Sequence, residues 1–152
     1  MDEKKKSYLI EPTTPFRHSL PLQLRFSDID ALGHLNNAMY FNLYDLGKAK
    51  YLTAVRGEEV DWNKANIVVA NVNCNFLRPV YFDEHIAVQT QMLSLQERSF
   101  KLLQQIVNID TGEIKSQCTT VMVGFDVAAA CSAPISPEWH DMLCAYEGRD
   151  LK

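Results

Sequence analysis

The segment from Ala38 to Val55 constrains the fold of this chain more than any other. It has no proline and a single glycine, and its apolar side chains lie almost all round the helix that it predicts. Such a helix is about 27 Å long at 1.5 Å per residue. Because it has no wide polar face, we expect it to be buried on most sides. The small residues Gly47 and Ala49 would let another backbone come close.

The period of the apolar residues changes to two from Ile67 onward, which predicts strands rather than helices. The first of these strands alternates apolar residues with asparagines, which predicts one apolar, half-buried face before Pro79 ends it. An Asp-Thr-Gly turn at 110–112 joins the last two strands as a hairpin. The predicted strands cover residues 22–26, 67–76, 86–95, 100–109 and 114–127, and a short helix is expected at 138–146.

This order of elements, one strand, one long helix and then four strands, predicts an α+β fold. The sheet must be mostly antiparallel and must curl round the apolar helix. With 152 residues we expect a single domain, 1–152, with a lead-in at 1–20, a polar connection at 56–64 and a C-terminal tail at 128–152 that carries the short helix. The open edges of such a sheet favour association of two copies.

Charge and the chain ends exclude several classes of protein. The chain has 15 basic and 19 acidic residues, a net charge of −4, so no global positive field attracts nucleic acid. The N-terminal residues lack the apolar stretch of a secretory signal, and no run of about 18 apolar residues predicts a membrane span. The four cysteines form no C-x-x-C pair and have no zinc-ligand spacing, which indicates a reduced, cytoplasmic protein and no metal site.

Polar residues are dense between the first strand and the long helix, where Asp28, Asp30, His34, Asn36 and Asn37 fall within ten residues. One interpretation is purely structural, because Asp and Asn form turns and either asparagine would cap the helix. The other is catalytic. A helix start presents unpaired N–H groups that polarise a carbonyl, and a carboxylate just upstream would attack it or activate water.

The same segment carries a family resemblance. The pattern Arg25-x-x-Asp28-x-Asp30-x-x-Gly33-His34-x-Asn36-Asn37-x-x-Tyr40 resembles the signature of the 4-hydroxybenzoyl-CoA thioesterase family. Weaker similarities follow at 44–51, 75–80 and 98–100. The resemblance implies a hotdog fold, in which an antiparallel sheet wraps one long helix, and hydrolysis of acyl thioesters.

Carried onto this sequence, the family's catalytic carboxylate falls on Asp30, as either nucleophile or general base. The backbone N–H that polarises the thioester carbonyl falls on Asn37. Asn36 and Tyr40, beside it, are candidate substrate-binding residues, although a packing role for Tyr40 is an open alternative.

His34 is the third candidate catalytic residue. The segment also resembles the plant-type acyl-ACP thioesterases, whose catalytic Asp-x-Asn-x-His pattern matches Asp30 and His34. Leu32 stands where that pattern has its asparagine. We therefore expect His34 to support Asp30 or a water rather than to lead the reaction.

Arg98 and Ser99 resemble an element that meets substrate phosphates in relatives, and an Arg is well suited to phosphate. The resemblance implies no cofactor. Coenzyme A or phosphopantetheine would be part of the substrate, which is an acyl-CoA or an acyl-carrier protein. A homodimer or homotetramer is implied. Two rival functions are a hotdog hydratase or dehydratase and a non-catalytic acyl-CoA-binding module.

Overall fold

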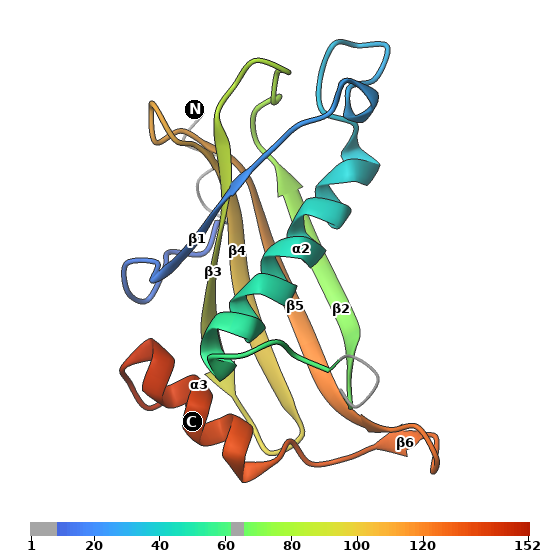
Figure 1. Ribbon diagram of the computed structural model, residues 1–152, viewed down its shortest axis with the longest axis vertical. Helices are drawn as coiled ribbons and strands as arrows, with labels where there is room; N and C mark the ends of the chain where they lie inside the picture. The colour runs from blue at the N-terminus through green and yellow to red at the C-terminus, as the bar shows by residue number, and fades with distance from the viewer. Residues whose placement is uncertain (1–8, 62–65) are drawn as a thin grey trace.

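The computed structural model describes residues 9–61 and 66–152. Residues 1–8 of the predicted lead-in and 62–65 of the predicted connection lie outside this part. Figure 1 shows one long helix crossing a sheet. The strands are β1 (His18–Leu22), β2 (Ile67–Phe76), β3 (Ile86–Leu95), β4 (Ser99–Asn108), β5 (Ile114–Asp126) and β6 (Cys131–Ser132). The helices are η1 (Phe26–Asp28), α2 (Asn37–Arg56) and α3 (Pro137–Glu147).

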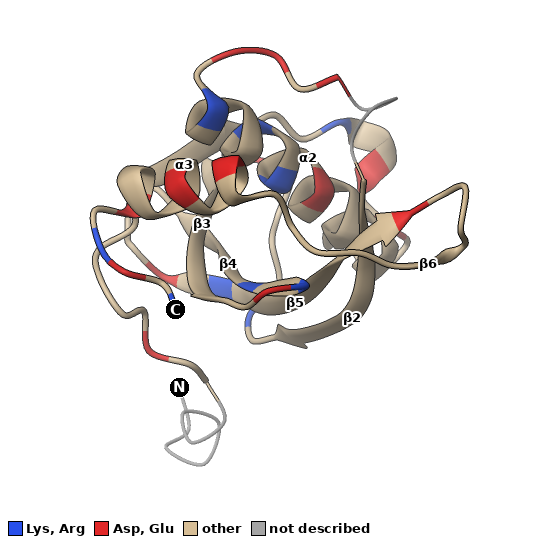
Figure 2. Cartoon of the chain, turned by 90° about the horizontal axis from the view of Figure 1, so that it is seen from below, with Lys and Arg blue, Asp and Glu red and all other residues tan. Residues whose placement is uncertain are grey.

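The sheet has the order β1-β3-β4-β5-β2, every neighbouring pair is antiparallel, and β6 adds to β5. In Figure 2 the sheet curves beneath α2. This arrangement confirms the predicted α+β fold with an antiparallel sheet around one long helix. No helix in the described part of the chain is long and apolar enough to cross a bilayer.

The first strand was predicted four residues too late, at 22–26, whereas β1 ends at Leu22. Pro21 obscures the signal in the sequence, because proline lacks the N–H that a central strand needs. It is tolerated here because β1 is an edge strand that pairs only with β3. Phe26 instead enters the 3-10 turn η1.

Helix α2 is buried along one face only, so the expectation of burial on most sides was wrong. Tyr44 and Tyr51 are buried against the sheet, whereas Phe41 and Leu46 on other faces are 42% and 44% exposed. The sheet supplies a single layer against the helix, and the described chain has no second layer over its outer side.

Strand β2 also differs from its prediction, because most of both its faces is exposed. Val68, Val72 and Phe76 are each about two-fifths exposed. The strand forms an edge that pairs only with β5, and α2 covers the middle of the sheet more fully than this margin.

The C-terminal tail completes the core at the far end of α2. In the described part of the chain β1 pairs with β3 only as far as Thr90, so this edge of β3 has no partner strand at Met92. The buried Glu147 carboxylate accepts bonds from the Met92 N–H at 2.8 Å and from the Tyr51 hydroxyl at 2.6 Å. Arg149 donates to the Met92 carbonyl oxygen. The tail therefore supplies hydrogen-bond partners to the part of the β3 edge that β1 does not reach.

Part of the predicted lead-in packs on the sheet rather than forming a loose end. The side-chain amide of Gln117 pairs with both backbone groups of Ile10, and the Gln91 amide holds Thr13 and Thr14 in the same way. These glutamines are almost fully buried, so residues 10–14 satisfy polar groups on the sheet.

Gly47 sets the distance between α2 and the sheet. A Cβ atom at this position would lie 2.9 Å from both Cγ atoms of Val88 and 3.0 Å from Gln104 Nε2. Gly47 is a point of close approach, as its small size predicted, but the neighbouring atoms belong to the side chains of Val88 and Gln104 rather than to another backbone. The approach lets Gln104 donate to the Tyr44 carbonyl oxygen at 3.0 Å and to Thr90 Oγ1 at 3.1 Å.

We expect Gly47→Ala to destabilise the protein by about 1–3 kcal/mol, because the added methyl group overpacks the core. In an exposed helix interior the same change would stabilise by about 1 kcal/mol, so the sign is informative. Chemical denaturation measures it, with Lys50→Ala on the exposed side of the helix as the control. A more stable Gly47→Ala variant would contradict the close approach.

Candidate active site

The turn before α2 is organised by Asp28, which is buried. Its Oδ2 accepts from the Arg25 N–H at 2.8 Å, and its backbone carbonyl oxygen accepts from the Asn36 N–H at 2.9 Å. Asp28 thus ties the start of the turn to the residue that caps the helix. This agrees with the structural interpretation of this carboxylate.

Asp30 and His34 close a tight turn through their backbones. The Asp30 N–H donates to the His34 carbonyl oxygen at 2.9 Å, and the Gly33 N–H donates to that of Asp30 at 3.0 Å. Gly33 has φ +81°, a conformation that favours glycine. Asp30 Oδ1 accepts from the Leu32 N–H at 2.9 Å. Its Oδ2 has no hydrogen-bond partner among the described residues, so it is available to a water or a substrate.

The start of α2 carries the second chemical element. Asn36 is the N-cap, and its side-chain oxygen accepts from the Ala38 N–H at 3.0 Å. Within residues 9–61 and 66–152 the Asn37 N–H has no acceptor. This N–H lies at the positive end of a 20-residue helix, where partial charge of about +0.5 accumulates. It is therefore suited to a carbonyl oxygen or an oxyanion.

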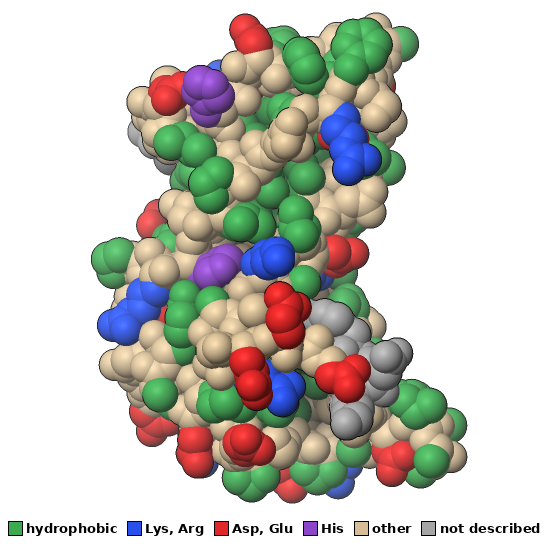
Figure 3. Space-filling model, in the orientation of Figure 1, with side chains coloured by type: hydrophobic (Ala, Val, Ile, Leu, Met, Phe, Trp, Pro, Cys, Tyr) green, Lys and Arg blue, Asp and Glu red, His purple; other side chains and the backbone are tan. Residues whose placement is uncertain are grey.

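The segment between β2 and β3 packs against this turn. The Leu35 N–H donates to the Val80 carbonyl oxygen at 2.8 Å. The His34 ring contacts Tyr81 edge-on at 5.3 Å between centroids, and Phe26 contacts Phe82 at 6.2 Å. Figure 3 shows hydrophobic side chains on the surface at the upper end of the molecule, where these two segments meet.

Lys115 fixes the position of that segment. Its ammonium group is 2.6 Å from Glu84 Oε1 and 2.8 Å from Glu113 Oε1, and it also contacts the Pro79 carbonyl oxygen at 3.3 Å. The Lys115 side chain is only 5% exposed. Burial alone would raise the pKa of Glu84, but hydrogen bonds from Lys115, the Tyr81 N–H and Asn108 outweigh it and lower that pKa.

These elements surround a pocket of about 270 Å³. It brings together four of the predicted site residues, and the end of β2 with the segment after it forms the remaining wall. Burial raises the pKa of Tyr40 to about 12, so its phenol is neutral at physiological pH. The lining residues are Asp30, Leu32, His34, Leu35, Asn37, Tyr40, Phe76, Leu77, Arg78 and Pro79.

Three of the predicted site residues make contacts of another kind. Among the described residues no side-chain hydrogen bond joins His34 to Asp30, and the imidazole instead packs on Tyr81. Tyr40 is 2% exposed and its ring packs edge-on against Phe76 at 4.9 Å, which supports the packing role. Asn36 caps the helix and does not line the pocket.

Arg98 and Ser99 lie far from the pocket within one chain. Ser99 on β4 and Val68 on β2 both pair with Val123 on β5, so they lie at the same height in the sheet. The pocket lies at the other end of β2, beside Phe76. Seven residue steps along β5, from Val123 to Ser116, separate these levels, about 23 Å at 3.3 Å per residue. Arg98 donates to the Ser132 carbonyl oxygen at 3.1 Å.

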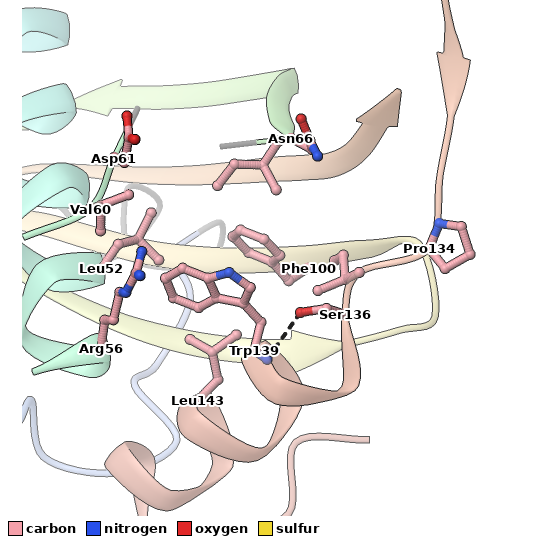
Figure 4. A pocket seen from close by; sticks show the side chains of 12 residues that line it. Leu52, Arg56, Val60, Asp61, Asn66, Phe100, Pro134, Ser136, Trp139 and Leu143 are labelled. Carbon is pink, nitrogen blue, oxygen red and sulfur yellow. Dashed lines mark hydrogen bonds between the residues drawn. The ribbon is translucent and has the colours of Figure 1, made fainter. Parts of the chain in front are cut away.

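A second pocket, of about 370 Å³, lies at the opposite end of α2 between that helix and α3 (Figure 4). Leu52, Phe100, Trp139 and Leu143 form much of its wall. The adjacent end of α2 is its C-terminus, which presents carbonyl groups and partial negative charge. It cannot polarise a substrate carbonyl, so the pocket at the start of α2 is the candidate active site.

Sequence reasoning missed the apolar wall formed by Phe76, Leu77 and Pro79, and the role of Lys115. The similarity at 75–80 was the available signal for the wall. Lys115 gave none, because a lysine in a strand is usually solvated. Its burial arises from Glu84, which lies 31 positions earlier in the chain.

Comparison with known proteins identifies the family of this chain. A model of the thioesterase-like superfamily matches residues 24–143. The long-chain acyl-CoA thioesterase FadM of Escherichia coli (strain K12) is 23% identical over 125 residues, which are 80% of this chain and 93% of that protein.

Solved structures show the same fold. A thioesterase from Thermus thermophilus, crystallised with coenzyme A and Zn, has a TM-score of 0.78 and 25% identity, covering 88% of this chain and 96% of that one. The 1,4-dihydroxy-2-naphthoyl-CoA thioesterase Slr0204 from Synechocystis has a TM-score of 0.75 and 13% identity, covering 84% and 94%.

The fold is thus the hotdog fold of acyl thioesterases, as predicted. The chain belongs to the thioesterase-like superfamily, and the activity that this membership indicates is thioester hydrolysis.

We expect Lys115→Met to destabilise the protein by about 1–3 kcal/mol, because the partly buried Glu84 loses its main partner. The lowered pKa of Glu84 stabilises the fold above the ordinary pKa of a glutamate, and this contribution is lost as pH falls through the folded-state value. Chemical denaturation at pH 7 and in the acid range measures the free energy of unfolding. The difference between wild type and variant should become smaller as the pH is lowered. Glu113→Gln, which changes the more exposed partner of Lys115, should destabilise the protein less. Equal losses of stability in the two variants would contradict the assignment of Glu84 as the main partner of Lys115.

Proposed function

We propose that the protein hydrolyses an acyl-CoA thioester to a free acid and a thiol. One observation carries the proposal: an unpaired helix-start N–H at Asn37 and a free carboxylate oxygen of Asp30 line the same pocket. The two groups supply what hydrolysis needs, an electrophile for the carbonyl oxygen and a base or nucleophile for its carbon.

In the reaction the carbonyl oxygen of the thioester accepts a hydrogen bond from the Asn37 N–H. Asp30 Oδ2 takes a proton from water, whose oxygen forms the new bond to the carbonyl carbon. The C–S bond then breaks, and the departing thiolate receives the proton from Asp30. In the alternative mechanism Asp30 Oδ2 attacks the carbonyl carbon itself, the C–S bond breaks and the thiolate leaves. Water then cleaves the mixed anhydride, which releases the acid, restores the Asp30 carboxylate and leaves a proton for the thiolate. Both mechanisms use the same groups, the Asn37 N–H and Asp30. Because a thiolate is a good leaving group, neither needs much assistance from an acid.

The pocket wall favours an acyl group over a polar substrate. Leu35, Phe76, Leu77 and Pro79 supply apolar surface, and the neutral Tyr40 phenol adds no charge. FadM, a relative over most of both chains, is a long-chain acyl-CoA thioesterase. A CoA ester is therefore the substrate we favour, with an acyl-carrier protein as the alternative donor. The chain's free cysteines fit the cytoplasmic location that we propose.

The proposal includes a homodimer in which Arg98 acts across the interface. The exposed edge of β2 has unpaired backbone groups that a second β2 would satisfy by antiparallel pairing. If the two-fold axis passes through the middle of β2, Val68 of one copy lies beside Phe76 of the other. The partner subunit's Arg98 would then lie three strand spacings, about 14 Å, from the pocket. This separation suits the pantetheine arm that joins a thioester to the phosphates of CoA. A homotetramer would be two such dimers.

Two other functions compete with hydrolysis. A hydratase or dehydratase on the same fold would add water to an enoyl thioester, and a binding module would hold acyl-CoA without turnover. The free Asp30 oxygen beside the helix start favours hydrolysis. Thiol release from a panel of acyl-CoAs, with enoyl-CoA hydration measured in parallel, separates the three.

We expect Asp30→Asn to lower kcat by about 10²–10⁴-fold, because the amide is neither a base nor a nucleophile. The fold should persist, since the amide oxygen still accepts the Leu32 N–H. Thiol release measures the loss, and circular dichroism checks the fold. His34→Ala, which removes a ring that packs on Tyr81, should cost less. Retained turnover in Asp30→Asn would exclude this carboxylate, and a larger loss in His34→Ala would favour the plant-type arrangement.

We expect Arg98→Ala to raise KM for acyl-CoA about tenfold with little change in kcat, the effect of one lost charge-assisted hydrogen bond. An acyl-pantetheine substrate, which lacks the nucleotide phosphates, should have the same KM in both proteins. Steady-state kinetics on the two substrates make the comparison. Equal changes for both would show a structural effect instead.

Mixed dimers test whether Arg98 acts across the interface. Asp30→Asn and Arg98→Ala subunits, refolded together, form heterodimers with one site that has Asp30 from one chain and Arg98 from the other. Recovery of the wild-type KM supports action across the interface. A mixture with only the high KM of Arg98→Ala would place Arg98 outside its neighbour's site.

A further inference from the structure

Cys74 and Cys118 face each other across the β2–β5 ladder, where they are register partners. Directly opposed residues in antiparallel strands have Cα atoms about 4.5 or 5.5 Å apart. Disulfides span Cα separations of about 4.4–6.8 Å, so this pair needs no change of register to form a bond. Neither Cys131, on β6, nor Cys144, on α3, is paired with a cysteine in the described sheet.

Both thiols lie on the side of the sheet that α2 covers. They pack with Tyr40 and Tyr44 in one cluster of apolar residues, where Cys118 is 1% exposed and Cys74 is partly exposed. A reagent thus reaches Cys74 first, and Cys118 lies behind it. Two residues further along β2, Phe76 forms part of the active-site wall.

A chain of hydroxyl groups supports a charge on Cys74. The Tyr44 hydroxyl donates to Ser116 Oγ at 2.7 Å, which leaves the Ser116 proton free for the Cys74 sulfur at 3.5 Å. A hydrogen bond from Cys118 lowers the pKa of Cys74 to about 7 against the opposing effect of burial, and Ser116 acts in the same direction. The bond to Cys74 and burial raise the pKa of Cys118. The two thiols therefore have different roles, a nucleophile and a resolving partner.

We propose that Cys74 and Cys118 form a reversible disulfide that links the edge strand β2 to β5 beside the active site. The oxidant is a hydroperoxide such as hydrogen peroxide. The Cys74 thiolate attacks one peroxide oxygen, so that an S–O bond forms, the O–O bond breaks and water leaves. The Cys118 sulfur then attacks the sulfenic sulfur, the S–S bond forms and a second water carries away the oxygen. Two thiols lose two electrons, and the peroxide gains them.

The linkage is easily reduced for a geometric reason. Cβ atoms of opposed strand residues lie about 4.5–5.5 Å apart, whereas a disulfide prefers about 3.5–4.5 Å. The strands must draw together to close the bond, and a disulfide held under such strain has a more oxidising potential than a structural one. This property suits a regulatory modification.

Peptide mapping after oxidation of the folded protein tests the proposal. The Cys131→Ser/Cys144→Ser variant, which retains only the two opposed thiols, is treated with hydrogen peroxide at pH 7 and quenched with an alkylating agent in acid. We expect both thiols to be lost together, a linked pair of peptides containing Cys74 and Cys118, and full recovery with dithiothreitol. The rate should fall as pH is lowered through about 7, because the thiolate is lost.

The Cys118→Ser variant is the matched control. With no resolving thiol, Cys74 should accumulate as a sulfenic acid that dimedone traps. Two results in the Cys131→Ser/Cys144→Ser variant would overturn the proposal. One is that both thiols stay free after peroxide treatment, and the other is that Cys74 is oxidised while Cys118 still reacts with the alkylating agent. These chemical readouts do not depend on thioesterase activity, so they stand or fall separately from the proposed function.

Discussion

The close contact of α2 with the sheet at Gly47 is the constraint on which the rest of the structure depends. At this contact the Val88 side chain occupies the space of the missing Cβ, and Gln104 hydrogen-bonds the helix backbone at Tyr44. A rigid helix fixed at its middle has both ends fixed as well. Its start therefore lies beside the end of β2, where the active-site pocket forms, and its C-terminal end meets α3.

Polar side chains line the pocket, among them Asp30, His34 and Arg78, but the group proposed to polarise the substrate carbonyl is a backbone N–H. The positive potential at its centre comes from the first N–H groups of α2, and the turn that presents Asp30 is closed by backbone hydrogen bonds. In the proposed reaction these N–H groups let a chain of net charge −4 stabilise an anionic transition state. Side chains act mainly as supports: Asp28 and Asn36 satisfy backbone donors, and Lys115 holds the opposite wall.

Local pattern was sufficient for the long elements, because their periodicity extends over ten or more residues. Strand β3 was predicted with its observed bounds, and α2 and β5 within one residue at each end. The motif between residues 25 and 40 identified the turn, the cap and most of one side of the pocket. The prediction failed at β1, where Pro21 masks an edge strand, and for the burial of β2 and of the outer side of α2. Burial depends on which elements cover which, and periodicity reports only that an apolar face exists.

The sequence by itself determined the order of the long elements, the helix start to within one residue and the polar turn before it, because these features depend on neighbours within a few positions. Only the tertiary structure decided that Phe76 and Pro79 close the pocket, that Lys115 holds its wall, that Arg98 lies about 23 Å away along the sheet and that Cys74 faces Cys118. Those relationships arise from strand register and from contacts between residues tens of positions apart. A single sequence has no local signal for register, because a shift of two residues leaves the alternation unchanged.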